Sequence, residues 1–233
     1  MDHVREAIAE LSAHPGPLLV RGEPGTGKSL VAGMLGAAVA QVIDCHDAGS
    51  QGWEAISYPT ASVVMIEEVG DATRELQLSL VDFFRARGPA VRLIATTSRD
   101  IERFSRTGNF LPELFELLSG PAIWLPPLRT RRSDVPELAA HFLGSLPGRE
   151  LDWDALCLLE RQSWPGNVRQ LREAIRRLAL LHDRITLDHV ECELRTMRVE
   201  ASRPPQPLHP SEGDVDGPRI PHQSVSARSS PSS

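Results

Sequence analysis

Strand-like runs and amphipathic stretches follow one another over the first half of the chain. The runs have the length and apolar character of buried strands, and they occupy residues 17–20, 41–44, 62–66 and 90–96. Apolar residues recur at helical spacing in the stretches at residues 4–11, 30–40 and 76–87. Strands that are separated by helices form parallel βαβ units. We therefore predict an α/β fold with a doubly wound parallel sheet.

The second half of the chain has helical spacing until its composition changes. Helices are predicted at residues 134–143, 152–162 and 167–182. Further on, the chain is rich in Pro, Ser and Gly and has few apolar residues, so it cannot bury enough surface to fold. We expect an α/β domain at residues 1–128, a small helical domain at 129–198 and a disordered tail at 199–233.

A Gly-rich segment lies between the first predicted strand and the helix after it. It fits the pattern G-x-x-x-x-G-K-[ST] at every fixed position. In this spacing the backbone N–H groups point at a phosphate chain, Lys28 reaches the β- and γ-phosphates, and Ser29 places its hydroxyl on Mg²⁺. The flanking strand and helix favour a phosphate site over a chance Gly-rich turn. The predicted residues for binding ATP with Mg²⁺ are Gly22, Glu23, Pro24, Gly25, Thr26, Gly27, Lys28, Ser29 and Leu30.

The composition of the chain excludes several kinds of binding partner and cellular compartment. The 233 residues carry a net charge of −6 without a long basic run, which argues against free-standing binding to a nucleic-acid backbone. Cys45, Cys157 and Cys192 form no C-x-x-C, so a reduced, cytoplasmic setting is the simplest inference. The spacing in residues 44–47 is wrong for a closed zinc site. The N-terminus does not resemble a signal peptide, and no apolar run is long enough to span a bilayer.

Two glutamates follow the third predicted strand. A P-loop ATPase needs acidic groups at the end of a neighbouring strand, where one carboxylate holds Mg²⁺ through water and a second polarises the attacking water. Glu67 and Glu68 occupy this place after residues 62–66. We assign Glu67 to the metal site together with Ser29, and Glu68 to catalysis. Two exposed glutamates after a strand are the alternative.

Several segments, in the same order, resemble the AAA+ domain of the sigma-54-dependent transcription activators, the bacterial enhancer-binding proteins. They are residues 22–29, 66–71, 91–100, 125–129 with 131–136, and 164–171. The last segment contains Trp-Pro-Gly-Asn-Val-Arg, which is very specific. The resemblance runs from near the N-terminus to about Val190. It implies the AAA+ fold with a helical lid, binding of ATP and Mg²⁺, and ring assembly in which neighbours complete each other's sites.

The resemblance also implies roles for individual residues. Lys28 and Ser29 match the Walker A pair, and Glu68 matches the catalytic glutamate of Walker B. Thr97 matches the threonine of the sensor I segment. Arg169 matches the sensor II arginine, which reaches from the lid to the nucleotide. A solvated arginine at a helix start is the alternative for Arg169.

The chain departs from the family at several positions. Glu67 replaces the Walker B aspartate, Ser98 replaces the sensor I asparagine, and Asp44 falls where the family has an asparagine that positions the catalytic glutamate. The G-A-F-T-G-A loop, which touches sigma-54 in the family, should lie between Cys45 and Ser62. Nothing like it is there, and the insertion before the sensor I strand is also missing.

The largest departure concerns the arginine fingers. The family's F-R-x-D-L-Y-x-R-L corresponds to residues 110–118, and both arginines are leucines here, Leu111 and Leu117. A finger that a neighbour supplies is worth about 10³–10⁵ in rate. Arg103 or Arg106 could substitute, although exposed helix or loop charges are the favoured interpretation of both.

These observations leave three hypotheses. The leading one is an ATP-binding regulatory or assembly subunit in transcription regulation, with slow hydrolysis at most, in a homo- or hetero-oligomeric AAA+ ring or with a companion AAA+ protein. The second is a working ATPase that drives sigma-54-type activation or remodelling with an arginine from a partner. The third is an interaction protein with an empty pocket, which the intact P-loop argues against. Direct DNA binding is not expected, because the tail has no recognition-helix pattern.

Overall fold

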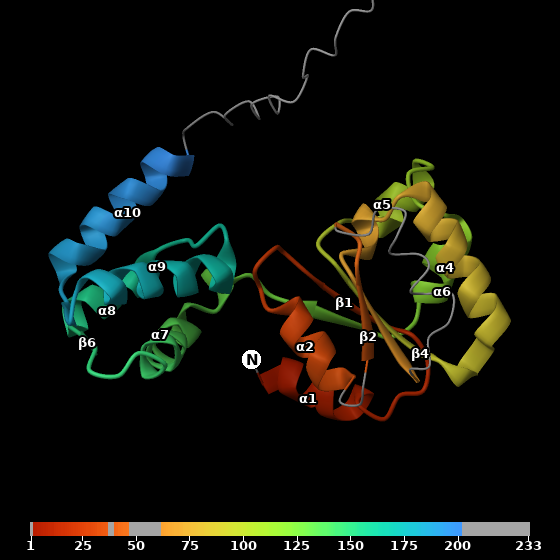
Figure 1. The fold of residues 1–233 in the computed structure, drawn as a ribbon, viewed down its shortest axis with the longest axis horizontal. Coiled ribbons are helices and arrows are strands. Elements are labelled where there is room, and N and C mark those ends of the chain that lie inside the picture. Colours follow the sequence, from red (N-terminus) through yellow and green to blue (C-terminus); the bar gives the residue numbers. More distant parts are fainter. Residues whose placement is uncertain (1, 37–39, 47–61, 202–233) are drawn as a thin grey trace, which may run out of the picture.

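The computed structural model describes residues 2–36, 40–46 and 62–201. They form an α/β part and a helical part, the lid, which are joined by the segment that follows β5 (Figure 1). One parallel sheet has the strand order β2-β3-β4-β1-β5. Its strands are β1 (Leu18–Gly22), β2 (Ala40–Asp44), β3 (Val63–Glu67), β4 (Arg92–Thr97) and β5 (Ala122–Leu125). The predicted α/β fold with a parallel sheet is confirmed.

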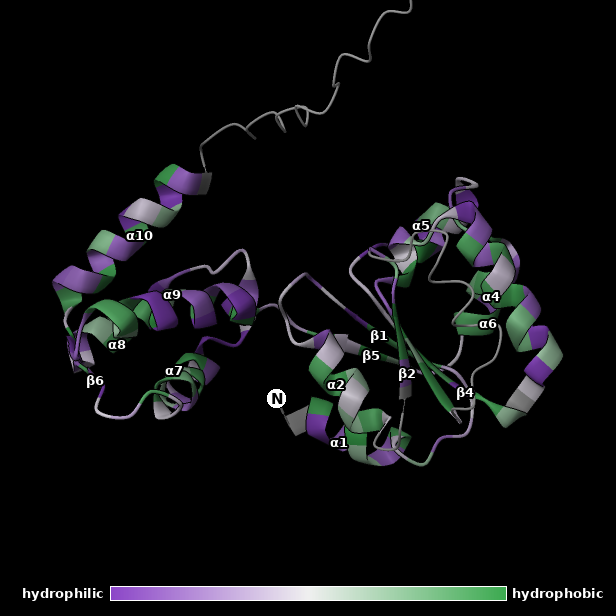
Figure 2. Ribbon diagram, in the orientation of Figure 1, coloured by the Kyte–Doolittle hydropathy of each residue, from purple (hydrophilic) through white to green (hydrophobic). Residues whose placement is uncertain are grey.

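Helices cover both faces of the sheet. On one face lie α1 (Asp2–Leu11) and α2 (Lys28–Leu35), and on the other lie α4 (Arg74–Arg87), α5 (Ile101–Arg106) and α6 (Pro112–Leu118). The central strands are mainly hydrophobic, with charged residues at or near their ends, whereas the helices mix hydrophobic and hydrophilic residues (Figure 2). Burial on both faces explains why the central strands are nearly continuous apolar runs in the sequence.

Helix α2 ends earlier than the sequence predicts. Gly36 follows its last residue, Leu35, and donates its backbone N–H to the Ala32 carbonyl. Glycine favours a helix end, and Ala40 already pairs with Val63 in the sheet. The predicted helix through residue 40 is therefore too long. The predicted loop at residues 48–60 lies outside the described residues.

Short 3₁₀ turns join several elements. The turns η1 (Val69–Asp71) and η2 (Gly88–Ala90) lie before α4 and β4 respectively. The turns η3 (Leu128–Thr130) and η4 (Arg132–Asp134) lead from β5 to the lid. The latter pair therefore forms the connection between the two parts.

The lid packs four helices beside a two-stranded ribbon. The helices are α7 (Val135–Gly144), α8 (Trp153–Arg161), α9 (Asn167–Leu181) and α10 (Leu187–Ala201), and the ribbon pairs β6 (Glu150–Leu151) with β7 (Arg184–Ile185). The first three helices match the predicted ones to within about a turn. The sequence does not predict α10, whose last residues overlap the start of the expected tail. No helix in the described ranges is both long and apolar enough to cross a membrane.

Trp164 anchors the core of the lid. Its side chain is 2% exposed, and its indole Nε1 donates a hydrogen bond of 2.8 Å to the Leu159 carbonyl. Trp164 and Asn167 have φ values of 46° and 53°, a conformation that is uncommon outside glycine. These two residues turn the chain at the beginning of α9. The turn buries Asn167 completely and brings its side chain to the P-loop.

Candidate functional site

The P-loop, residues 22–29, connects the end of β1 to the beginning of α2. Gly25 and Gly27 have φ values of 78° and 105°, which glycine adopts without the strain that a Cβ atom would cause. The Thr26 hydroxyl donates a hydrogen bond of 2.8 Å to the Glu23 carbonyl across the loop. Lys28 is the first residue of α2. The positive end of a helix dipole therefore lies at the loop, where it favours an anion.

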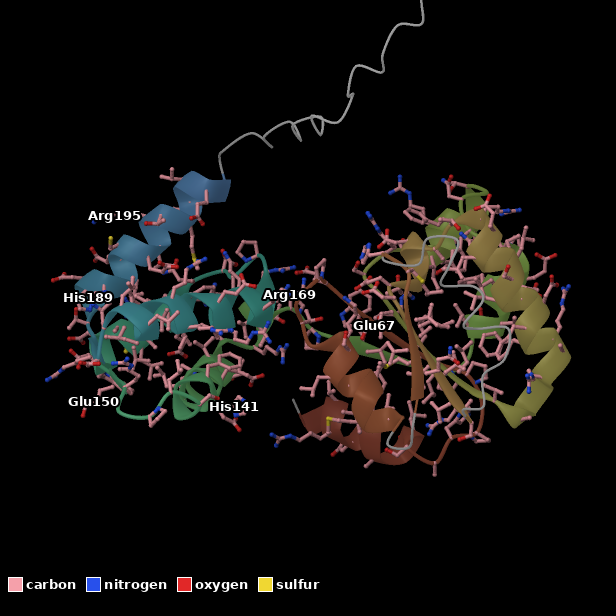
Figure 3. All side chains as sticks on the ribbon, viewed as in Figure 1. Glu67, His141, Glu150, Arg169, His189 and Arg195 are labelled. Carbon is pink, nitrogen blue, oxygen red and sulfur yellow. The ribbon has the colours of Figure 1, made fainter. Side chains whose placement is uncertain are left out.

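A cleft of about 400 Å³ opens between the P-loop and the lid. Its lining comprises Gly25, Gly27, Lys28, Ser29 and Leu30 of the P-loop region, Glu68 after β3, and His141, Phe142, Val168, Arg169 and Arg172 of the lid. Figure 3 shows Arg169 and His141 on the side of the lid that faces the α/β part. A larger cavity of about 540 Å³ beside α1 and β5 contains no P-loop residue. Chemistry rather than size therefore selects the smaller cleft as the candidate site.

Lys28 and Glu68 form an ion pair in this cleft. The Lys28 ammonium lies 2.8 Å from Glu68 Oε1, and it also donates a hydrogen bond of 3.2 Å to the Glu23 carbonyl. Partial burial on its own would raise the pKa of Glu68, but the Lys28 ammonium and the hydrogen bonds from Ser98 outweigh it and lower the pKa below 4.5. Glu68 is therefore a carboxylate at neutral pH.

Ser98 is the residue whose role the sequence does not reveal. Its backbone N–H and its hydroxyl both donate to Glu68 Oε2, at 2.7 and 2.9 Å. The predicted contact residue Thr97 is buried and does not line the cleft, and its hydroxyl accepts the Arg99 N–H at 3.0 Å. Asp44, which was expected near Glu68, accepts the His46 N–H at 2.9 Å within its own turn.

Ser29 and Glu67 are the predicted metal ligands. Ser29 lines the cleft, whereas Glu67 is half-buried as the last residue of β3 and is not part of the lining. Figure 3 places Glu67 on the side of the α/β part that faces the lid. Among the described residues, Glu67 has no ion-pair partner within 4.0 Å. Hydroxyl and carboxylate oxygens are suitable donors for Mg²⁺, so the chemistry of the pair fits the ion.

Glu23 and Pro24 connect the P-loop to the lid instead of lining the cleft. The Glu23 carboxylate accepts two hydrogen bonds from Arg129, at 2.7 and 2.6 Å. The Asn167 amide donates to Glu23 at 3.2 Å and to the Pro24 carbonyl at 3.0 Å. Its oxygen accepts the backbone N–H of Leu128 at 2.8 Å. One buried side chain thus joins the P-loop, the connecting segment and the lid.

The Glu23 contacts predict a pH dependence of stability. Hydrogen bonds from Arg129 and then from Asn167 lower the pKa of Glu23 from 4.5 to about 2. A carboxyl whose pKa is lowered in the folded state stabilises the fold above its unfolded pKa, and this contribution is lost as the pH falls from about 4.5 towards 2. Urea unfolding over this range should show a smaller loss of stability in Glu23→Gln than in the wild type. Parallel pH curves for the two proteins would contradict the assignment.

Gly25 is where the lid touches the P-loop most closely. Its carbonyl accepts the Arg169 backbone N–H at 3.2 Å. A Cβ atom on Gly25 would lie 2.3 Å from the Gly166 carbonyl oxygen, a distance that no real contact shows. The Thr26 carbonyl accepts a hydrogen bond of 3.0 Å from Arg131. The lid and the segment that leads to it therefore contact the backbone of the P-loop directly.

Gly25→Ala should lower the thermal unfolding temperature more than Gly27→Ala does. Both residues have positive φ, so both variants carry a shared strain of about 1 kcal/mol. Only at Gly25 does the added methyl group meet backbone, since nothing lies within 4 Å of a Cβ on Gly27. Calorimetric unfolding of the two variants side by side isolates the lid contact. Equal unfolding temperatures would show that the lid does not rest on Gly25.

The two expected arginine-finger positions belong to the hydrophobic core. Leu111 is 4% exposed, and Leu117 packs against the same core. Of the two substitutes considered, Arg106 is paired with Glu102. Arg103 is exposed on α5. Neither leucine could be replaced by a projecting cation without disturbing the packing of α6.

Two known protein families match successive parts of the chain. The sigma-54 interaction domain matches residues 1–128, and the AAA+ ATPase lid domain matches residues 129–207. The DNA-binding transcriptional regulator NtrC of Azospirillum brasilense is 32% identical over 258 residues, covering 92% of this chain and 53% of that protein. NtrC of Salmonella typhimurium is also 32% identical, with coverage of 90% and 53%. The chain thus spans about half the length of these relatives.

Solved structures give the same fold. NtrX from Brucella abortus in complex with ATP has a TM-score of 0.73 at 24% identity, covering 85% of this chain and 56% of that one. The RuvB branch migration motor of Thermotoga maritima has a TM-score of 0.65 at 19% identity, covering 84% of this chain and 69% of that one.

The alignment with the Azospirillum NtrC is longer than the chain itself, 258 against 233 residues, so that relative has segments that this chain lacks. The resemblance to the sigma-54 activators is confirmed, and the chain belongs to the sigma-54 interaction domain family.

Proposed function

We propose that this chain is an ATP-binding AAA+ module that acts as a regulatory or assembly subunit in transcription regulation. The observation that carries the proposal is the cleft between the P-loop and the lid. It collects a phosphate-binding loop, a lysine, a carboxylate and a lid arginine from separate elements, namely Lys28, Glu68 and Arg169 beside the loop glycines. A solved relative, NtrX, is described in complex with ATP, which supports the same ligand here.

The proposal assigns a role to each predicted residue. The P-loop N–H groups and Lys28 would bind the phosphates, and Arg169 would contact them from the lid. Ser29 and Glu67 would hold Mg²⁺, which neutralises developing charge on the phosphates when it is bound. Glu68 would orient and polarise water. Glu23 and Pro24 would act indirectly, by fixing the P-loop against the lid.

Slow hydrolysis, at most, is the second element of the proposal. The positions that correspond to the arginine fingers are occupied by Leu111 and Leu117, which pack in the core. A homo-oligomer would therefore have no arginine at the usual place in a neighbour's site. In addition, Glu68 is bound on both carboxylate oxygens, by Lys28 and by Ser98. A companion AAA+ protein could supply an arginine, so the alternative is a working ATPase in a mixed assembly.

The setting follows from the same features. A homo- or hetero-oligomeric AAA+ assembly is proposed, as the resemblance to the family implies. A reducing, cytoplasmic compartment is proposed because Cys45, Cys157 and Cys192 are free thiols. Direct DNA binding by this chain is not part of the proposal. Contact with sigma-54 is not part of the proposal either, because the sequence has no counterpart of the G-A-F-T-G-A loop.

Steady-state ATP turnover across a range of protein concentrations tests the proposal. The purified chain is expected to turn over ATP slowly, with a rate per subunit that does not rise with concentration. Robust, concentration-dependent hydrolysis that collapses in Glu68→Gln would favour the alternative of a working ATPase. Because Glu68→Gln is nearly isosteric, it serves as the control for contaminating phosphatases.

A further inference from the structure

Glu68 is held by contacts on both of its carboxylate oxygens. Oε2 accepts two hydrogen bonds from Ser98, one from the backbone N–H and one from the hydroxyl, at 2.7 and 2.9 Å. Oε1 lies 2.8 Å from the Lys28 ammonium. The carboxylate therefore connects the end of β4 to the P-loop.

The backbone of Glu68 is fixed as well. Its φ and ψ values are 51° and 50°, in the left-handed region that non-glycine residues seldom adopt. Its N–H donates a hydrogen bond of 3.1 Å to the Thr96 hydroxyl. Such a conformation persists only where the surrounding structure holds it, and it is typical of functional sites. The orientation of Glu68 towards Lys28 is therefore imposed by its neighbours.

The Lys28 ammonium is also engaged by these contacts. Its side chain is 5% exposed, and its bonds to Glu68 and to the Glu23 carbonyl use two of its three N–H donors. A P-loop lysine faces the β- and γ-phosphates when nucleotide is bound. The γ-phosphate then brings further negative charge next to the Glu68 carboxylate, and like charges at this range repel. A nucleoside triphosphate must therefore displace Glu68 Oε1 from Lys28.

We propose that Ser98 is a positioning residue that holds Glu68 on Lys28 in the nucleotide-free chain, so that ATP binding has to break this contact. The inference rests on the proposed function, ATP binding in the cleft. Ser98 then lowers the affinity for ATP more than that for ADP, because the γ-phosphate adds the charge that competes with Glu68. After Oε1 is released, Ser98 still holds Oε2, and the carboxylate turns about this anchor.

The first test needs no nucleotide. Lys28 is the sole lysine of the sequence, so its acylation by an N-hydroxysuccinimide ester can be followed by mass spectrometry on the peptide that carries it. Ser98→Ala removes a hydrogen bond to a charged group and should raise the acylation rate about threefold or more. Ser98→Thr keeps the hydroxyl and should react at the wild-type rate. Ser119→Ala is the matched control, because that hydroxyl donates instead to the Phe115 carbonyl at 2.7 Å.

The second test compares nucleotides by titration calorimetry on the full chain. Ser98→Ala should bind ATP about three- to tenfold more tightly than the wild type, since a lost hydrogen bond to a charged group no longer opposes the γ-phosphate. Its affinity for ADP should change less than about twofold. A merely structural role of Ser98 would shift both affinities alike. In a Glu68→Gln background, Ser98→Ala should have no further effect on the ATP affinity, because the carboxylate to be held is gone.

The outcomes separate this inference from the proposed function. An unchanged acylation rate and an unchanged preference between ATP and ADP in Ser98→Ala overturn the inference. If the wild type binds neither nucleotide, the proposed function fails, while the acylation rates still decide whether Ser98 holds the ion pair. If Ser98→Ala does not fold, Glu68→Gln must raise the acylation rate, since it removes the charge from the same pair. An unchanged rate there also overturns the inference.

Discussion

Lys28→Ala is expected to weaken ATP binding strongly while the fold persists. The Lys28 ammonium lies in the cleft beside Glu68, and no other lysine exists in the chain to replace it. Hydrogen bonds to a charged group contribute about 1.5–3 kcal/mol each. The loss of two such bonds to phosphate corresponds to an affinity roughly 10²- to 10⁴-fold weaker.

Titration calorimetry with ATP measures this loss. Arg21→Ala is the control, because Arg21 is a cation at the end of β1, directly before the P-loop, and does not line the cleft. We expect the control to bind ATP like the wild type, and circular dichroism should show that both variants are folded. Wild-type affinity in Lys28→Ala would place the nucleotide elsewhere.

Trp164→Ala is expected to destabilise the lid by about 3–5 kcal/mol, as large-to-small substitutions of buried aromatic residues do. Trp164 is 2% exposed in the lid core and leaves the Leu159 carbonyl without its partner when it is removed. Because the lid has a core of its own, the loss should appear as faster hydrogen exchange and proteolysis within α8 and α9.

The chain offers a matched tryptophan for this experiment. Trp153 begins α8 but is 75% exposed, so Trp153→Ala should change stability by less than about 0.5 kcal/mol. Urea unfolding of the two variants compares burial directly, since the substitution is the same. Similar unfolding midpoints would mean that Trp164 does not anchor the lid.

The fold could be predicted where burial leaves a clear pattern. The strand at residues 63–67 is buried on both faces and therefore nearly continuous in apolar residues. Strand β5 has no such signal, because it is a four-residue edge strand in which Trp124 is 60% exposed. Helix α10 borders the Pro-rich tail, and its change in composition hides a short apolar stripe of Val190, Leu194 and Met197, which pack in the lid core. Pairing with β1, rather than a local pattern, determines strand β5.

Part of the candidate site could likewise be predicted from the sequence, and part could not. The P-loop could be predicted because fixed spacing in consecutive residues determines its backbone. The contacts of Ser98 with Glu68 and of Asn167 with Glu23 join residues 30 and 144 positions apart. Their hydroxyl and amide groups have many possible partners, and only the folded chain selects one. The sequence identified Ser98 as a departure from the family but not as a partner of Glu68.

Protection of Lys28 from acylation by ATP tests the central claim most directly, because it reports binding at one identified atom. The account predicts that acylation of the peptide carrying Lys28 slows with increasing ATP and reaches a plateau, with half-protection at the dissociation constant from calorimetry. Glu68→Gln should also be protected to a plateau, with half-protection at a lower ATP concentration, since the carboxylate that competes for Lys28 is gone. An acylation rate that stays constant up to saturating ATP would contradict the account, because the nucleotide would then not occupy the cleft between the P-loop and the lid.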